Sequence, residues 1–373
     1  MKQSSHRTAF VHDFLVSYGG AERVLESLIK LDAEAPIYTI LYDEEAMKGR
    51  FEGREIRTSF LQKLPKFIRK RYRWLLPLYS VAVESLDLRE FDIVISSSGA
   101  WSKGIVTRLR TFHIAYLHSP MRLLWDANER YLDMVRAGTF GRFVGRIYLS
   151  YLRVWDREAA DRPDLLVSNS EYTRERVAKY YRRDSVVVYP PVTLSEGPAP
   201  RPAREDFFLV VSRLTASKGI DIAVEAFNKL RLPLRIVGDG RERARLTASA
   251  GDSVTFLGSV GDAELVSLYR RARAVVVPSE EDFGMTAAEA VRLGTPIIAL
   301  GRGGAVEIIR EGLTGELFGA PTPEVLAEAV RRFLDGGSAS YVIDPDADTR
   351  FTEEHFLSVM SDLVNRKNDD PIQ

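Results

Sequence analysis

Short apolar segments alternate with helix-like segments along nearly all of the 373 residues, and this alternation limits the possible folds more than any other feature. Parallel strands need crossover connections, which are usually helices, so the pattern predicts an α/β fold of parallel layers. The strands predicted in the first half are 8–11, 37–40, 91–96, 112–117, 165–168 and 186–189. Those predicted in the second half are 207–212, 234–237, 254–257, 274–277 and 297–300.

A proline-rich stretch separates the two series of strands. Five prolines lie between residues 189 and 206, which is typical of a semi-rigid linker. We therefore predict Rossmann-like domains at 1–190 and 207–351, joined by a linker at 191–206. Ligands of such sheets bind beyond the carboxyl ends of the strands, so the chemistry is expected in a cleft between the domains. Residues 352–366 repeat apolar side chains at helical spacing, so this helix must pack on a partner.

The composition excludes several classes of function. Lys plus Arg equals Asp plus Glu at 52 each, so no overall basic field recruits nucleic acid. The chain has no cysteine, which excludes disulfides, thiolate zinc sites and cysteine nucleophiles. The N-terminal residues have no apolar signal core, and no apolar run is long enough to span a membrane. A cytoplasmic location is the expectation.

Two glutamates with seven residues between them, Glu281 and Glu289, mark the most informative motif. A helix start at Gly284 places Glu281 in a loop and Glu289 about one turn inside the helix. The free N–H groups from Gly284 to Ala287, among them those of Met285 and Thr286, favour a bound phosphate. Carboxylates beside that phosphate accept hydrogen bonds from the hydroxyls of a sugar and a ribose.

Two cations follow the predicted strand 207–212, at Arg213 and Lys218. Their position points toward the ends of the strands, where a diphosphate accepts charge-assisted hydrogen bonds; a solvated surface loop is the alternative. Gly238 and Gly240 follow strand 234–237, but Arg243 stands where the third glycine of a dinucleotide fingerprint is required. A tight turn is therefore the preferred interpretation, with a nearby ligand as the second.

Gly19 and Gly20 join the first strand to a helix, where glycines let the backbone approach a phosphate or a sugar; a plain turn looks the same. His118 ends strand 112–117 and is a candidate for catalysis, although a lone histidine is more often structural. The five histidines show no metal-like spacing, and we assign no metal and no cofactor.

Two basic aromatic stretches, 57–76 and 136–153, contain seven and four cations and no acidic residue. Such segments are attracted to anionic lipid, which predicts contact with a membrane surface. Amphipathic helices packed on a core, with cations reaching water, are an equally good interpretation.

Taken together, these motifs resemble the retaining GT-B glycosyltransferases of family 4. The likeness rests on Gly19-Gly20, His118, Arg213, Lys218, Gly238-Asp-Gly, the spacing of Glu281 and Glu289, and Gly294-Thr-Pro-Ile-Ile-Ala. Within the family, the stretches that begin at His118 and at Glu281 are most similar to mannosyltransferases of surface-polysaccharide assembly. The resemblance implies the GT-B fold, with an acceptor-binding N-terminal domain, a donor-binding C-terminal domain and a final helix that crosses back to the first domain.

The resemblance also implies roles for individual residues. Arg213 and Lys218 hold the donor diphosphate, the backbone at Met285 and Thr286 binds its phosphates, and Glu289 binds the ribose. Glu281 and His118 contact the donor sugar, while Gly19 and Gly20 close the phosphate site. Family members need no obligatory metal, and a leaving phosphate oxygen removes the acceptor proton.

The function implied is retaining transfer of a hexose, mannose from GDP-mannose first, to a glycan or a lipid-pyrophosphate-linked acceptor at the inner face of the plasma membrane. A UDP-sugar transferase (glucose, N-acetylglucosamine or galactose) is the alternative donor class. A non-catalytic nucleotide-sugar sensor is the alternative of another class. A phosphorylase requires a pyridoxal phosphate lysine, for which we find no candidate.

Overall fold

The chain divides into two compact units. The first contains Met1–Tyr189 with Glu354–Gln373, and the second contains Pro190–Glu353. The computed structural model describes residues 6–126, 138–194, 202–336, 341, 343–344 and 348–369. Part of the predicted linker, residues 195–201, and the first two residues of the stretch 136–153 therefore lie outside the described residues.

A seven-stranded parallel sheet forms the centre of the first unit. Its strands are β1 (Thr8–His12), β2 (Ile37–Thr39), β3 (Ile56–Thr58), β4 (Ile93–Ser98), β5 (Phe112–Leu117), β6 (Leu165–Ser168) and β7 (Val186–Val187). The spatial order is β3-β2-β1-β4-β5-β6-β7, so the chain reverses its direction of growth between β1 and β4. That reversal is the topological switch point, beside which doubly wound sheets bind ligands.

Helices cover both faces of this sheet. They are α1 (Gly20–Leu28), α2 (Glu44–Met47), α3 (Lys66–Arg69), α4 (Tyr79–Glu84), α5 (Arg122–Trp125), α7 (Thr139–Ala159), α8 (Glu171–Tyr181) and α15 (Glu353–Asp369), with 3₁₀ turns η1 (Ile29–Leu31), η2 (Phe60–Lys63), η3 (Tyr72–Leu78) and η4 (Ser102–Gly104). Alternate residues of β1 point to opposite faces, because the side chains of a strand repeat every two residues. Phe10 packs with one core and Ala9 and Val11 pack with the other.

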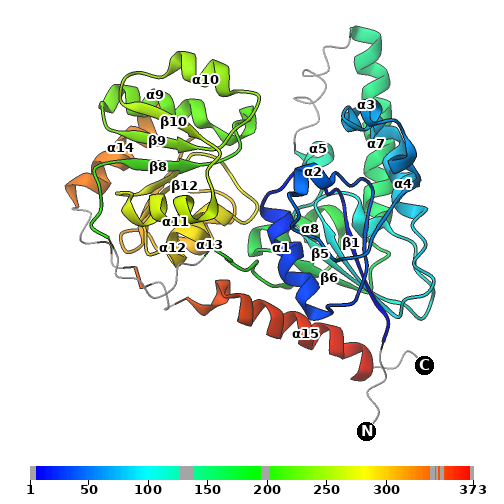
Figure 1. The fold of residues 1–373 in the computed structure, drawn as a ribbon. Helices are drawn as coiled ribbons and strands as arrows, with labels where there is room; N and C mark the ends of the chain where they lie inside the picture. The colour runs from blue at the N-terminus through cyan, green and yellow to red at the C-terminus, as the bar shows by residue number, and fades with distance from the viewer. Residues whose placement is uncertain are drawn as a thin grey trace. The chain divides into compact units, whose positions relative to one another are not determined.

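The C-terminal helix α15 packs on the first unit, as predicted. Phe356, Met360 and Leu363 are buried in the same core as Val24 and Leu25 of α1 (Figure 1). The helix therefore returns to the N-terminal unit after the chain has passed through the second one.

The opposite face contains a buried ion pair between Lys103 of η4 and Asp156 of α7, 2.6 Å apart. The side chains of Trp125 and Tyr181 also donate hydrogen bonds to Asp156, at 2.8 and 2.9 Å. Because the charges lie in the interior, these donors offset part of the cost of desolvating the carboxylate. The cluster fixes α7 and α8 against the sheet.

The second unit is built around a six-stranded parallel sheet. Its strands are β8 (Phe208–Val211), β9 (Leu234–Val237), β10 (Val254–Gly258), β11 (Val275–Val277), β12 (Ile297–Leu300) and β13 (Gly315–Phe318), in the order β10-β9-β8-β11-β12-β13. Its helices are α9 (Ile220–Leu230), α10 (Arg243–Ser249), α11 (Asp262–Arg271), α12 (Met285–Arg292), α13 (Ala305–Ile308) and α14 (Pro323–Asp335), with 3₁₀ turns η5 (Ala216–Lys218) and η6 (Thr349–Phe351). The switch point of this sheet lies between β8 and β11.

The predicted α/β fold is confirmed, and each predicted strand has a counterpart. Two short strands were missed, β3 with three residues and β13 with four. Both contain a charged residue, Arg57 in β3 and Glu316 in β13, which breaks the apolar run used to recognise buried strands. Among the described helices, none combines the length and the apolar character needed to cross a lipid bilayer.

Candidate functional site

Glu281 and Glu289 lie on either side of the start of α12 in the second unit. The helix begins at Met285 after Gly284, whose φ of 98° is in the left-handed region. Glu289 is one turn inside it, as predicted. One detail of the prediction is wrong, because the N–H of Ala287 donates to the carbonyl of Gly284 at 2.9 Å. The N–H groups of Met285 and Thr286 occupy the first two helical positions, which have no partner within the helix.

Lys218 and Glu281 meet across the switch point of the second sheet. Lys218 follows β8 and Glu281 follows β11, and Lys218 Nζ lies 2.7 and 2.6 Å from the two carboxylate oxygens. The hydroxyl of Ser279 donates to the same carboxylate at 2.6 Å. An ammonium has three donors and a carboxylate has about four acceptor positions, so both groups keep capacity for a ligand.

The loop that carries Glu281 is held by Gly303 and Gly304, which our sequence reasoning missed. The N–H of Gly304 donates to the carbonyl of Glu281 at 2.9 Å. A Cβ on Gly303 would lie 2.2 Å from that carbonyl oxygen, and a Cβ on Gly304 would lie 2.3 Å from the carbonyl oxygen of Phe283. The adjacent glycines after strand 297–300 were the available signal for this close contact.

Arg213 is exposed and lies two residues after the end of β8. No other side chain of the described residues binds its guanidinium, so its donors remain available to a ligand. Thr286 ties the start of α12 to the same strand, because its hydroxyl donates to the carbonyl of Val211 at 3.2 Å. The structure thus places Arg213, Lys218, Glu281 and Thr286 at the carboxyl ends of β8 and β11.

Gly238 and Gly240 have a structural reason to be glycine. Gly238 has φ 125°, and a Cβ there would lie 2.0 Å from the carbonyl oxygen of Ser212. A Cβ on Gly240 would lie 2.2 Å from that of Leu214. This turn therefore packs directly against the loop of Arg213, in agreement with the preferred interpretation of a tight turn.

Glu289 lies in the interior of the second unit, where only 6% of it is exposed. It accepts a hydrogen bond of 2.6 Å from the hydroxyl of the buried Tyr269. This hydrogen bond fixes the orientation of the carboxylate.

In the first unit, His118 ends a chain of hydrogen bonds at the carboxyl ends of β1, β4 and β5. Ser97 Oγ lies 2.8 Å from His118 Nε2 and 3.0 Å from His12 Nδ1. His12 Nε2 lies 3.5 Å from Glu22 of α1. Burial, followed by the neighbouring His12, lowers the pKa of His118 to about 4, so the imidazole is neutral near pH 7.

The proton positions in this chain depend on the tautomers of the two imidazoles. If a neutral His12 donates from Nε2–H to Glu22, its Nδ1 accepts from the Ser97 hydroxyl, which has only one proton to donate. Ser97 then accepts from His118 Nε2–H, which leaves His118 Nδ1 as an acceptor for a ligand hydroxyl. His12 and Ser97 were missed, although both lie at strand ends, the same signal that identified His118.

Gly19 and Gly20 lie at the start of α1, next to Glu22. Gly19 is the N-cap residue with an extended backbone, and a Cβ there would lie 3.3 Å from Glu22 Oε2. Asp13, which follows His12, accepts from the N–H groups of Gly99, Trp101 and Ser102 at 2.9, 3.0 and 2.6 Å. These contacts hold the loops around the histidines in one arrangement.

The described part of the chain contains no group of three or more His, Cys, Asp or Glu side chains arranged to hold a metal ion.

Two family models match the chain, one in each half. Residues 18–196 match the model described as Glycosyltransferase Family 4, and residues 193–347 match the model described as Glycosyl transferases group 1.

Two relatives illustrate the range of similarity. An uncharacterized glycosyltransferase of Methanocaldococcus jannaschii is 23% identical over 334 residues, which is 85% of each protein. The D-inositol 3-phosphate glycosyltransferase of Mycobacterium sp. (strain KMS) is 30% identical over 212 residues, which is 50% of this chain and 48% of the relative.

Solved structures share the fold over nearly the whole chain. HepE of Anabaena in complex with UDP and glucose superimposes with a TM-score of 0.70 at 18% identity, covering 96% of this chain and 99% of HepE. Sucrose-phosphate synthase of Thermosynechococcus elongatus gives 0.71 at 18% identity, covering 97% and 99%. The matches in both halves and the shared fold confirm the predicted architecture: the chain is a family 4 glycosyltransferase with the GT-B fold of two Rossmann-like domains.

Proposed function

We propose that the protein transfers a hexose, with retention of the anomeric configuration, from a nucleotide-diphosphate sugar to a glycan or a lipid-linked acceptor. GDP-mannose is the first candidate for the donor. The observation that carries the proposal is the contact of Lys218 with Glu281 beside the N-terminus of α12. It puts a cation, a carboxylate and free helix N–H groups at one switch point.

Each group at this switch point suits one part of a nucleotide sugar. The diphosphate suits the hydrogen-bond donors of the site, which are Arg213, the third donor of Lys218 and the N–H groups of Met285 and Thr286. The remaining acceptor positions of Glu281 suit hydroxyls of the transferred sugar. Glu289, oriented by Tyr269, suits ribose hydroxyls. From the family resemblance we further assign His118 to the donor sugar and Gly19 and Gly20 to the phosphate side.

The proposed chemistry is electrostatic. Negative charge grows on the nucleoside diphosphate as the glycosidic bond breaks, and the preorganised donors of Arg213, Lys218 and α12 stabilise it. The leaving phosphate oxygen takes the acceptor proton on the same face, which gives retention. Such a site needs no metal, so we expect transfer to continue in EDTA. The product anomer, read from proton coupling constants by NMR, tests retention directly.

A UDP-sugar is the second candidate for the donor, because the structurally similar HepE is described in complex with UDP and glucose. Thermal unfolding with GDP-mannose, UDP-glucose, UDP-N-acetylglucosamine and GDP-fucose separates the candidates, since a bound donor stabilises the folded state by mass action. A rise in Tm without hydrolysis or transfer of the donor would favour the non-catalytic sensor. No rise with any donor would contradict the proposal.

We also propose that the first unit contacts the inner face of the plasma membrane through a single surface formed by both basic stretches. α7 exposes an apolar stripe, with exposed fractions between 48% and 79% at Phe140, Phe143, Val144, Ile147, Tyr151 and Val154. Phe67 and Trp74, in the segment 57–76, are 69% and 77% exposed. The two stretches pack on each other, as the hydroxyl of Tyr148 donates to the carbonyl of Leu76 at 3.1 Å.

Charge complementarity supports anionic lipid as the partner of this surface. Two of the seven cations of segment 57–76 already have carboxylate partners in the structure, which lowers the charge available to a lipid surface. Arg57 pairs with Glu55 and Glu90, and Lys66 pairs with Glu45. Cations near an anionic bilayer contribute about 1 kcal/mol each, and salt screens this attraction.

Sedimentation with phosphatidylglycerol vesicles tests the surface. We expect binding at low salt, release at high salt, and weaker binding of Trp74→Ser and Phe143→Ser. The matched control is Leu313→Ser, which removes an exposed apolar side chain from the second unit. Equal partition onto neutral phosphatidylcholine vesicles, or equal loss in the control, would contradict the proposal.

A further inference from the structure

Two neighbouring serines of β4 are each in contact with a histidine ring. Ser96 Oγ lies 2.8 Å from Nε2 of the buried His113. Ser97 Oγ lies between His118 and His12, at 2.8 and 3.0 Å. Because the side chains of a strand alternate between its two faces, these serines point to opposite sides of the sheet. The strand thus contains two buried serine–histidine contacts, of which only one reaches His118.

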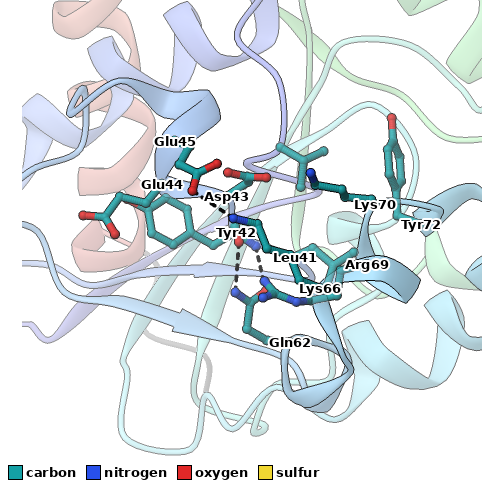
Figure 2. A pocket seen from close by; sticks show the side chains of 11 residues that line it. Leu41, Tyr42, Asp43, Glu44, Glu45, Gln62, Lys66, Arg69, Lys70 and Tyr72 are labelled. Atoms are coloured by element: carbon teal, nitrogen blue, oxygen red, sulfur yellow. Dashed lines mark hydrogen bonds and ion pairs between the residues drawn. The ribbon is translucent and has the colours of Figure 1, made fainter.

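Polar groups on the surface of the same unit are held much less firmly. Figure 2 shows a pocket of about 440 Å³ lined by three acidic and three basic side chains. In its ion pair the side chains of Lys66 and Glu45 are 56% and 78% exposed, so water replaces either partner at little cost. Ser97 and His12 are 0% and 2% exposed, and buried polar groups of this kind depend on protein partners. Few arrangements of their protons are therefore possible.

The direction of these hydrogen bonds follows from the end of the chain at Glu22. An ionised carboxylate has no proton to donate, so His12 faces Glu22 Oε1 through its Nε2–H, 3.5 Å away. A charge-assisted bond from an imidazolium is usually about 2.7–2.9 Å long, so this longer contact favours a neutral His12. With His12 neutral, its Nδ1 accepts from Ser97, and Ser97 in turn accepts from His118.

We propose that this chain, from Glu22 to Ser97, holds His118 in its Nε2–H tautomer and so keeps Nδ1 as an acceptor for the donor sugar. His118 is half-buried, and among the described residues its Nδ1 has no hydrogen-bond partner. A bare Nδ1 accepts and cannot donate, so it recognises the hydrogen of a sugar hydroxyl. Glu22, His12 and Ser97 are then positioning residues, which act through His118 and need not touch the ligand. The inference rests on the proposed glycosyl transfer, which assigns His118 to the sugar.

The backbone of His118 is fixed independently of this chain. Its N–H donates to the carbonyl of Ser98 at 2.8 Å, and its carbonyl accepts from the side chain of Asn169 at 2.9 Å. Loss of the Ser97 hydroxyl should therefore free the imidazole while the main chain stays in place.

Long-range proton–nitrogen NMR spectra, which report the tautomer of each imidazole, test the inference. The signal of His118 is identified by its loss in His118→Gln, and we expect the Nε2–H form in the wild type. The Nδ1–H form should appear in Ser97→Ala, which removes the link. It should also appear in Glu22→Gln, whose amide can donate to His12 and so reverse the chain.

Ser96→Ala is the matched control for these spectra. It removes a contact of the same kind and length, from His113, and should leave the His118 signal unchanged. An Nδ1–H imidazole at His118 in the wild type, or a Ser97→Ala spectrum like that of the control, would overturn the inference.

Donor turnover separates the positioning role from the proposed function. Ser97→Ala should lower kcat/KM by roughly two- to tenfold, the range expected for one hydrogen bond, and Ser97→Thr, which keeps the hydroxyl, should recover most of it. A merely structural role would affect both serine variants alike, whereas we expect Ser96→Ala to stay near the wild type. If the wild type turns over no donor, the proposed function fails, and the positioning role fails with it even where the spectra show the Nε2–H form. If the wild type is active and the two serine variants have equal rates, the positioning role alone is refuted.

Discussion

Replacing Lys218 with Ala tests the central contact of the donor site. The substitution removes the two hydrogen bonds to Glu281 and the remaining donor that faces a ligand. A hydrogen bond to a charged group is worth about 1.5–3 kcal/mol. Loss of the single donor to the diphosphate therefore lowers kcat/KM by roughly ten- to 150-fold. If Glu281 also loses its orientation toward the sugar, we expect a result near the upper end of that range.

The same variant should remain folded. The side chains of Lys218 and Glu281 are each 23% exposed, and a partly solvated pair of this kind contributes about 0–1 kcal/mol to stability. The Tm should therefore fall by only a few degrees, on the order of what 1 kcal/mol produces in a domain of this size.

Initial rates of donor turnover, measured together with Tm, give the assay. Lys229→Ala is the matched control, because Lys229 is also a paired lysine of the second unit, bound to Glu225 and Glu324 on the surface. Near-normal turnover in Lys218→Ala, or an equal loss in the control, would refute the assignment of Lys218 to the diphosphate.

Three further predictions concern stability. Burial lowers the pKa of His118 to about 4 and that of His113 to about 3. Both groups bind protons more readily in the unfolded chain, so Tm should fall as the pH drops from about 6.5 toward 4, and His113→Gln should flatten that slope. Asp156→Ala leaves Lys103 buried without its carboxylate and should lower the free energy of unfolding, measured in urea, by about 3–5 kcal/mol. The double variant Lys103→Met, Asp156→Leu removes both charges and should lose less. Gly238→Ala, at a positive φ with its Cβ 2.0 Å from a carbonyl oxygen, should lower Tm, whereas Gly261→Ala, in open space, should not.

The sequence was sufficient for the fold because the apolar strands are short and well separated. Strands 112–117 and 297–300 agree with the structure residue for residue, since both are buried on two faces and are apolar at every position except His113. The short strands β3 and β13 carry a charge within three or four residues, so composition alone cannot separate them from loops.

Predicting the site was harder, because its contacts join segments that are distant in sequence. Lys218 and Glu281 were predicted from separate motifs, Lys218 for the diphosphate and Glu281 for the sugar. Their contact could not be predicted, because only the strand order shows that β8 and β11 are neighbours. The same limit applies to His12 and His118, whose link through Ser97 depends on β4 lying between β1 and β5. The assigned roles of these residues in a reaction remain predictions.

The environments of Glu281 and Glu289 argue against an acid and base couple. A glycoside hydrolase needs one carboxyl group that delivers a proton to the leaving oxygen and a second on the other side of the bond. Glu281 instead accepts hydrogen bonds from Lys218 and Ser279, and Glu289 accepts one from Tyr269. Both carboxylates thus act as hydrogen-bond acceptors in this structure, which is the role that the hydroxyls of a sugar or a ribose require. In the proposed reaction each glutamate therefore holds a hydroxyl in place, and the neighbouring cations and the first N–H groups of α12 stabilise the departing phosphate.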